Sequence, residues 1–269
     1  REMPDPFTDV DTAPPEMIEI MATALETRAA DPSMTPIVDG YLDALDISDG
    51  TVIVDIGAGT GGVTRQIATR FPAASVLGIE PSVALTQKAV ELASSLPNLS
   101  FSVGDGAQLD QSDASADVAI LHTVLSHVHD PTILVNEVVR ILRPGGTLVI
   151  CDADFSKAAM GTVPGDPLGA CVEAFVSRAV TDPWLTGKLR PMMRKLGLEV
   201  DRFTIQNRVV TEGMGSLVWV RMSSASLVSE GVIGQPLADA LEAEYIRRAE
   251  DSSLYGFLPF VTLIARKPE

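Results

Sequence analysis

The chain has few cysteines, few basic residues and no long apolar run, and each shortage excludes a class of protein. Two cysteines in 269 residues, Cys151 and Cys171, supply neither a disulfide framework nor the spacing of a metal site. The 20 lysines and arginines are outnumbered by 36 aspartates and glutamates. The net charge of −16 disfavours a nucleic-acid partner, because binding phosphates requires a basic footprint.

Targeting signals are missing as well. No apolar run approaches the roughly 20 residues of a membrane span, and no signal-peptide pattern opens the sequence. The first residue is Arg1 rather than Met, so we expect the sequence to be trimmed. These shortages predict a reduced, cytoplasmic protein without a membrane partner.

What the sequence does have is an alternation of strand and helix patterns. Strands are expected at 51–56, 75–80, 99–103, 117–122 and 147–152, with helices between them at 61–70, 81–95 and 131–142. Such alternation requires right-handed crossovers and a parallel sheet covered on both faces. Further strands at 198–210 and 258–265 complete the prediction: an α/β fold with a doubly wound, mostly parallel seven-stranded sheet of Rossmann-like type.

The pattern divides the chain into three parts. Residues 1–46 form an N-terminal helical segment, with helices at 16–28 and 36–45 after a loose stretch over 1–12. Residues 47–155 form the Rossmann-like core, in which the carboxyl ends of the strands are the expected place for a cofactor. Residues 156–269 form a helical lid or substrate region, with helices at 166–180, 184–196, 216–229 and 236–251, plus the final strands. Both tryptophans lie outside the core, so we expect the lid to cover a hydrophobic acceptor.

The most informative segment runs V-I-V-D-I-G-A-G-T-G-G over residues 52–62. Gly57, Gly59 and Gly61 lack the Cβ atoms that would block the close approach of a ligand, and glycine allows positive φ in the turn. The spacing D-x-G-x-G-x-G, which starts at Asp55, resembles the nucleotide turn of class I S-adenosylmethionine-dependent methyltransferases.

A competing interpretation uses the same glycines. Gly57, Gly59 and Gly62 also satisfy G-x-G-x-x-G, the dinucleotide fingerprint, and Glu80 stands near the position of its ribose-binding acid. Asp55 favours the methyl donor, because a carboxylate there would repel a pyrophosphate but would attract a sulfonium or an ammonium group. A turn that merely lets helix and strand pack closely is the third interpretation.

The resemblance implies a cofactor role for residues that follow each strand. Glu80, followed by Pro81, would accept hydrogen bonds from the two ribose hydroxyls, although it could instead only favour the next helix N-terminus. Asp105, Gly106 and Ala107 would bind the adenine edge, and Asp105 could also be a plain turn residue. His122 could offer its backbone carbonyl to the α-ammonium group.

Arg28 lies on the apolar stripe of the first long helix. Its head could reach water while its stem packs, or it could bind the methionine carboxylate at the edge of the cofactor cleft. Segments 121–131 and 140–147 resemble later motifs of the same superfamily, in the branch typified by ubiquinone-biosynthesis-like enzymes. The resemblance covers about residues 16–152.

All three histidines fall within eight residues: His122, His127 and His129. A metal site is not expected, because no cysteine is nearby and Asp130 is explained as a helix N-cap before Pro131. His127 is the candidate general base, since histidine titrates near neutral pH. Alternatively, it only braces its loop.

The sequence therefore predicts methyl transfer from S-adenosylmethionine to a small organic acceptor by in-line displacement, with S-adenosylhomocysteine as product. The acceptor atom could be oxygen, nitrogen, sulfur or carbon, in a natural product or secondary metabolite. An NAD-dependent oxidoreductase and a non-methylating member of the fold remain alternatives. The oligomeric state stays open.

Overall fold

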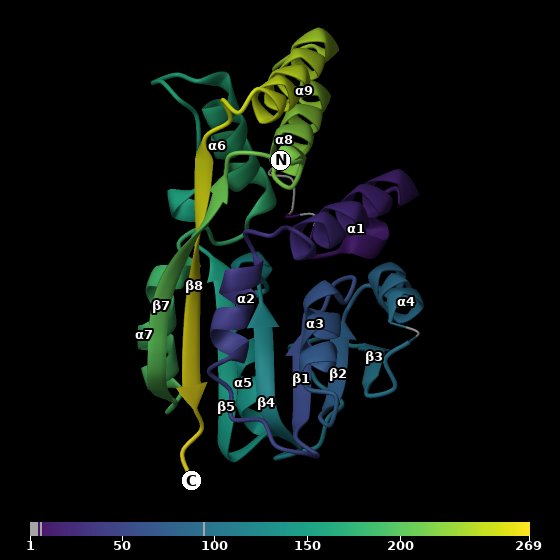
Figure 1. Ribbon diagram of the computed structural model, residues 1–269, viewed down its shortest axis with the longest axis vertical. Helices are drawn as coiled ribbons and strands as arrows, with labels where there is room; N and C mark the ends of the chain where they lie inside the picture. The colour runs from purple at the N-terminus through teal and green to yellow at the C-terminus, as the bar shows by residue number, and fades with distance from the viewer. Residues whose placement is uncertain (1–4, 6, 94) are drawn as a thin grey trace.

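The computed structural model describes residues 5, 7–93 and 95–269 and contains one mixed β-sheet flanked by helices (Figure 1). The sheet order is β3-β2-β1-β4-β5-β8-β6, and β7 pairs with β8 off this path. The strands are β1 (Val52–Ile56), β2 (Ser75–Glu80), β3 (Leu99–Val103), β4 (Ala116–His122), β5 (Leu142–Ala153), β6 (Ala159–Met160), β7 (Glu199–Val210) and β8 (Gly256–Arg266). The predicted mostly parallel α/β sheet is confirmed, and all seven expected strands are present.

One strand was not expected. The first five strands pair in parallel, whereas β8 runs antiparallel to β5, β6 and β7. The eighth strand, β6, has only two residues, too few to produce an alternating pattern in the sequence. β8 is long enough to pair with β5 along its C-terminal part and with β6 at its N-terminal end.

The helices of the described residues match the sequence pattern within a few residues at each end. They are α1 (Pro15–Ala29), α2 (Thr35–Leu42), α3 (Gly62–Arg70), α4 (Val83–Leu92), α5 (Pro131–Ile141), α6 (Pro167–Ala179), α7 (Leu185–Lys195), α8 (Leu217–Ser229) and α9 (Gln235–Glu250). Short 3₁₀ turns occupy Val10–Thr12, Leu125–His127 and Phe155–Lys157. At the start of α5, Asp130 accepts a hydrogen bond from the Thr132 amide at 3.0 Å, as expected of an N-cap.

The two faces of the sheet form two separate hydrophobic cores. On one face, α2 and α3 pack with side chains such as Ile53 and Ile120. On the other face, α5 and α7 pack with side chains such as Val54 and Leu148. Successive strand residues point to opposite faces, and both faces are packed against helices. β1 therefore buries almost every side chain, and its sequence is a nearly continuous apolar run.

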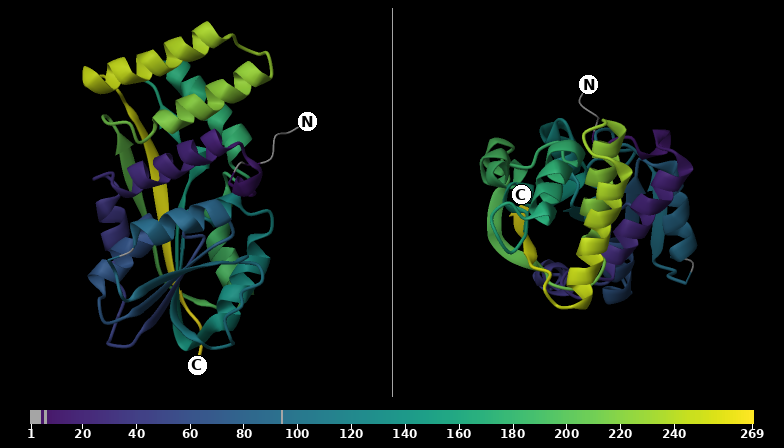
Figure 2. Two further views of the ribbon diagram at one scale, coloured as in Figure 1. Left: turned by 90° about the vertical axis from the view of Figure 1, so that its right-hand side faces the viewer. Right: turned by 90° about the horizontal axis from the view of Figure 1, so that it is seen from above.

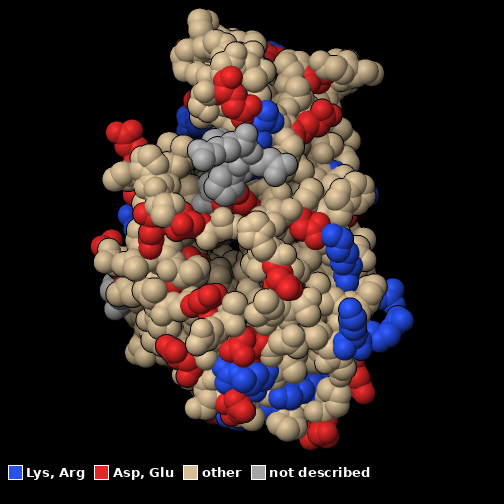
Figure 3. Space-filling view, turned by 180° about the vertical axis from the view of Figure 1, so that it is seen from behind, with Lys and Arg blue, Asp and Glu red and all other residues tan. Residues whose placement is uncertain are grey.

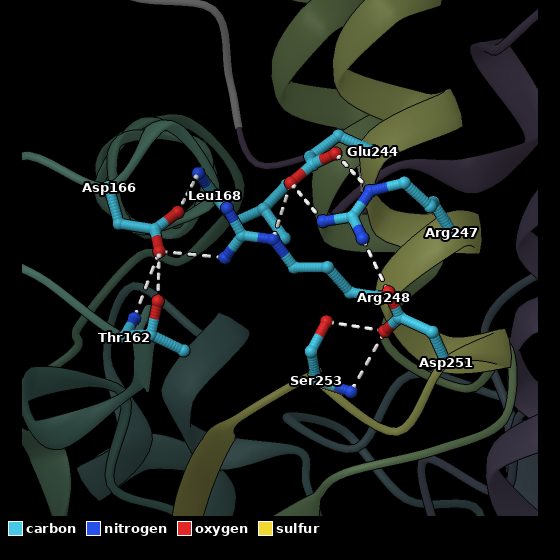
Figure 4. A network of polar contacts seen from close by, with 8 residues as sticks. All are labelled: Thr162, Asp166, Leu168, Glu244, Arg247, Arg248, Asp251 and Ser253. Carbon is cyan, nitrogen blue, oxygen red and sulfur yellow. Dashed lines mark hydrogen bonds and ion pairs between the residues drawn. The ribbon is translucent and has the colours of Figure 1, made fainter.

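Helices α6, α8 and α9 form a cap beyond the carboxyl ends of the parallel strands, and α1 lies between this cap and the sheet (Figures 1 and 2). Figure 4 shows how α9 is tied to the start of α6. Arg248 lies between Glu244 and Asp166, with nitrogen–oxygen distances of 2.6 and 2.7 Å. Asp166 also accepts hydrogen bonds from the backbone amides of Thr162 and Leu168, so one carboxylate joins two segments of the cap.

The expectation of a loose stretch over residues 1–12 is wrong for its described part, while residues 1–4 and 6 lie outside the described residues. Val10 is buried. Asp11 accepts hydrogen bonds from the Val83 amide at 2.7 Å and from the Ser82 hydroxyl at 2.6 Å, at the start of α4. A carboxylate at a helix N-terminus satisfies free amides and favours the helix dipole, so this segment is fixed to α4.

None of the described helices is long and apolar enough to span a bilayer. Both cysteines are buried and free. On the face drawn in Figure 3, acidic side chains are scattered widely, and lysines and arginines gather toward the lower edge and one side.

Candidate cofactor and acceptor pocket

A pocket of about 600 Å³ lies between the carboxyl ends of the strands and the cap. Its lining includes the glycine turn after β1, the residues that follow β2, β3 and β4, and side chains from α1, α6 and α8. Carboxyl ends of parallel strands are where ligands bind in open α/β sheets. Every residue that the sequence nominated for the site, except Gly61, lines this pocket, namely Arg28, Asp55, Gly57, Gly59, Glu80, Pro81, Asp105, Gly106, Ala107, His122 and His127.

The backbone of the glycine turn has the conformation that its sequence predicts. Gly57 and Gly61 have φ of +75° and +79°. A Cβ atom at Gly57 would lie 2.6 Å from Cγ2 of Val124, and one at Gly61 would lie 2.5 Å from Cζ of Phe101. The turn therefore requires glycine both for its left-handed backbone and for its close packing.

Two buried carboxylates flank this turn. Asp55, at 2% exposure, accepts a hydrogen bond from Thr64 Oγ1 at 2.6 Å. Burial raises the pKa of Asp55 to about 7, against the opposing hydrogen bond from Thr64, and the nearby charge of Glu80 adds to the rise. No cation pairs with Asp55 within the part of the chain that the structure describes. A positively charged group of a ligand would therefore stabilise the ionised form of this buried carboxyl.

Glu80 closes the turn from the neighbouring strand. Its Oε2 accepts from the Gly59 amide at 2.9 Å and its Oε1 accepts from the Ser82 amide at 3.0 Å. Burial raises the pKa of Glu80, and these two amides oppose the rise. A carboxylate held in this way keeps unused lone pairs that can accept further hydrogen bonds from a ligand in the pocket.

The Asp105 segment has a more ordinary local geometry. Asp105 is exposed, and its Oδ1 accepts from the Ala107 amide at 2.9 Å, which makes it a turn residue. Asp105, Gly106 and Ala107 nevertheless all line the pocket. A turn residue at the pocket rim can still bind a ligand, so the local geometry is compatible with the adenine interpretation.

Arg28 lines the pocket and is partly buried. Burial lowers its pKa to about 10, and the positive charge of Arg208 adds to that effect, whereas Asp152 opposes it. Arg208 is satisfied, because its Nη2 lies 2.6 Å from Asp31 Oδ2 and its Nη1 donates to Ser216 at 2.8 Å. Among the described residues, Arg28 has no carboxylate within ion-pair distance, so it is available to an anionic group of a ligand.

The three histidines do not converge on one point. His122 is buried beside the Tyr41 hydroxyl, with 3.2 Å between Nδ1 and the phenolic oxygen, and burial lowers its pKa to about 3, an effect to which Arg28 adds. His129 is exposed. His127 lines the pocket with its Nδ1 2.7 Å from Asp5 Oδ2. A search of the described residues finds no group of three potential metal ligands.

Sequence reasoning missed three features of the site. Asp5 belongs to a segment that was expected to be loose, and Arg208 comes from a strand whose side chains are mostly exposed. Thr123 follows β4 with φ of +57°, a strained conformation for a β-branched residue, and its buried hydroxyl has no hydrogen-bond partner among the described residues. Backbone strain of this kind is common at functional sites, but the local sequence does not indicate it.

The far end of the pocket is aromatic. Successive ring centroids from His127 to Phe155, Phe175 and Trp219 lie 5.9, 6.4 and 6.0 Å apart. The rings of Phe155, Phe175 and Trp219 come from the 3₁₀ turn at Phe155–Lys157, from α6 and from α8, and they reach from the strand ends into the cap. The pocket therefore has a polar end at the glycine turn and an apolar end under the cap.

Known proteins resemble the part of the chain that carries the first five strands. A family model described as "Methyltransferase domain" matches residues 54–150. A trans-aconitate 2-methyltransferase of Methylobacterium radiotolerans is 26% identical over 91% of this chain and 97% of its own length. The chain spans only about a third of the length of the first curated relatives it matches.

Solved structures share the fold at lower identity. A phosphoethanolamine N-methyltransferase 2 of Haemonchus contortus, solved with phosphomonomethylethanolamine and S-adenosylhomocysteine, has a TM-score of 0.62 at 19% identity over 98% of this chain and 60% of its own. The [4+2]-cyclase SpnF has a TM-score of 0.59 at 20% identity over 94% of each chain. Residues 54–150 of this chain are a methyltransferase domain of the class I, S-adenosylmethionine-dependent type.

Proposed function

We propose that the protein transfers the methyl group of S-adenosylmethionine to a small organic acceptor. The observation that carries this proposal is the pair of buried carboxylates, Asp55 and Glu80, on either side of a glycine turn that opens into the pocket. A dinucleotide would place a pyrophosphate against this negative charge. A ligand with a sulfonium and an ammonium group would supply the positive charge that the site lacks.

The residues around the turn fit the cofactor group by group. Glu80, with Pro81 beside it, accepts hydrogen bonds from the ribose hydroxyls. Asp105 and the backbone of Gly106 and Ala107 bind the adenine edge. When bound, S-adenosylmethionine supplies an electrophilic methyl group on its sulfonium.

The methionine end of the cofactor meets two charged groups and one backbone carbonyl, which come from three elements. Arg28, which has no carboxylate partner among the described residues, binds the methionine carboxylate. The backbone carbonyl of His122 and the carboxylate of Asp55 favour the ammonium group. Together these groups orient the methyl toward the aromatic end of the pocket, and positioning of this kind supplies much of the rate enhancement of a displacement reaction.

The acceptor occupies the aromatic end, which favours a body with a large apolar surface. The names of the related proteins do not select one acceptor, because aconitate and phosphoethanolamine differ in both the methylated atom and the polar groups. The net charge of −16 supports a small-molecule acceptor over nucleic acid. Membership of the ubiquinone-biosynthesis-like branch remains a prediction.

A second candidate is a non-methylating enzyme that uses the same fold. The similarity to a [4+2]-cyclase over 94% of both chains favours keeping this candidate, since fold does not fix chemistry. Release of S-adenosylhomocysteine during turnover would separate the two, because only methyl transfer consumes the cofactor.

Calorimetric titration with S-adenosylmethionine, S-adenosylhomocysteine and NAD tests the site. We expect binding of the first two and none of NAD. Glu80→Gln should weaken cofactor binding roughly 10- to 100-fold, as expected when one charge-assisted hydrogen-bonding group is neutralised. Asp110→Asn, an exposed substitution after β3, is the matched control and should change nothing. Binding of NAD alone would contradict the proposal.

A further inference from the structure

The ring of His127 is held by a carboxylate from the first residues of the chain. Its Nδ1 lies 2.7 Å from Oδ2 of Asp5, and the two side chains are only 12% and 4% exposed. The same Oδ2 accepts from the backbone amide of Thr181 at 3.0 Å and from its hydroxyl at 3.1 Å. Asp5 is therefore fixed from two sides, by the loop before α7 and by the imidazole.

Packing fixes the plane of the imidazole as well. The ring of Phe7 lies 5.0 Å from the His127 ring between centroids, and that of Phe155 lies 5.9 Å away. Phe7 and His127 both line the pocket. The segment that carries Asp5 therefore also forms part of the wall around the acceptor end.

A second carboxylate lies near, but it is occupied elsewhere. Asp152 is fully buried, and its oxygens accept from the backbone amides of Ser126 and Ala153 at 3.3 and 2.9 Å. Burial raises the pKa of Asp152, and no hydrogen bond joins its carboxylate to the His127 ring among the described residues. Of the described acidic groups, Asp5 alone lies within hydrogen-bond distance of the ring.

This contact determines which ring nitrogen carries the proton. An ionised carboxylate can only accept hydrogen bonds, so Nδ1 of a neutral His127 must be the protonated nitrogen. Nε2 then keeps its lone pair, and no described protein group bonds to it. The nitrogen that can accept a proton is therefore Nε2, on a ring that lines the pocket.

We propose that Asp5 is a positioning residue that holds His127 as a general base for an acceptor with a protic nucleophile, a hydroxyl on an apolar body. This inference rests on the proposed function. In the reaction the acceptor oxygen bonds to the methyl carbon, the carbon–sulfur bond breaks with its electron pair left on sulfur, and the hydroxyl proton moves to Nε2. A neutral amine has a free lone pair and needs no base, so the arrangement favours a hydroxyl.

The tautomer of His127 tests the inference without any acceptor. Long-range ¹H–¹⁵N spectra, recorded at about pH 8.5, above the ordinary imidazole pKa of about 6.5, distinguish a protonated ring nitrogen from a bare one. The chain has three histidines, so His122→Gln and His129→Gln variants assign the three rings. We expect the Nδ1–H form for His127 in the wild-type protein.

Asp5→Asn should reverse this preference. The asparagine amide can donate to Nδ1, which moves the ring proton to Nε2 and removes the base from the pocket. Asp9→Asn is the matched control, because it makes the same change of charge at an exposed position in the same segment, and it should leave the spectrum unaltered.

The spectrum of the wild-type protein tests the role of Asp5 even if the Asp5→Asn variant fails to fold. A wild-type ring in the Nε2–H form, or an unchanged ring in a folded Asp5→Asn protein, would overturn the role of Asp5. Titration of the wild-type protein with S-adenosylmethionine keeps the two proposals apart. Cofactor binding with the Nε2–H tautomer refutes only this inference. The Nδ1–H tautomer without cofactor binding refutes the proposed function, and with it the role as a base, but leaves the positioning of the ring by Asp5 intact.

Discussion

Replacing Asp55 by asparagine should stabilise the cofactor-free protein at neutral pH while it weakens cofactor binding. Burial raises the pKa of this carboxyl from 3.8 to about 7 in the folded protein. A folded state that holds a proton more tightly than the unfolded chain has its full stability below the unfolded pKa. It then loses stability as pH rises through the folded pKa. Asparagine fills the same space, keeps an oxygen for the Thr64 hydroxyl and does not titrate.

The size of the effect follows from the two pKa values. The difference between about 7 and 3.8, at about 1.4 kcal/mol for each pKa unit, gives roughly 4 kcal/mol. The variant should therefore differ little from wild type below about pH 4. Its advantage in unfolding free energy should grow to roughly 4 kcal/mol above about pH 7.

Urea unfolding at several pH values, without cofactor, measures this difference. Asp105→Asn makes the same chemical change at an exposed position after β3 and is the control for that change. A difference between Asp55→Asn and wild type that stays constant from about pH 4 to about pH 8, or a loss of stability that grows with pH, would refute the reasoning.

Two further changes test the turn and the cap by urea unfolding. Gly61→Ala should cost about 2–5 kcal/mol, the sum of a left-handed alanine and a Cβ atom 2.5 Å from Phe101. Gly197→Ala, with a similar φ and no atom within 4 Å, should show only the backbone part of about 1–2 kcal/mol, and equal costs would contradict the clash. Asp166→Ala should cost about 3 kcal/mol, because it leaves the largely buried Arg248 with Glu244 as its only described acid. A cost below about 1 kcal/mol, typical of a surface pair, would mean that this carboxylate does not hold the cap.

The parts of the structure that were predictable depend on short-range patterns. The turn from Asp55 to Gly62 is encoded in consecutive residues, because Gly57, Gly59 and Gly61 each have the positive φ that favours glycine. The helices were predictable from their apolar stripes, and α5 also from its N-cap at Asp130. Strand ends followed from the same patterns, so the pocket residues at those ends could be nominated as well.

The parts that were missed depend on contacts between distant residues. Asp5 meets His127 across 122 positions, and Arg208 meets Asp31 across 177. An acidic residue near a proline predicts a loop from the local sequence, and only the folded chain shows which residues it contacts. Arg28 is an intermediate case, because its place on an apolar stripe was visible in the sequence but its place in the pocket lining depends on the folded chain.

The position of β8 in the sheet has a consequence for how the protein is made. It follows all other elements in the chain, yet it lies between β5 and β7. Synthesis proceeds at about 5–20 residues per second. Until β8 has been synthesised, both of those strands have an unpaired edge where it will pair. Such edges are templates for pairing with another chain. A chain that ends before residue 256 would therefore expose unpaired strand edges. We expect such truncated forms of this protein to aggregate or to bind chaperones.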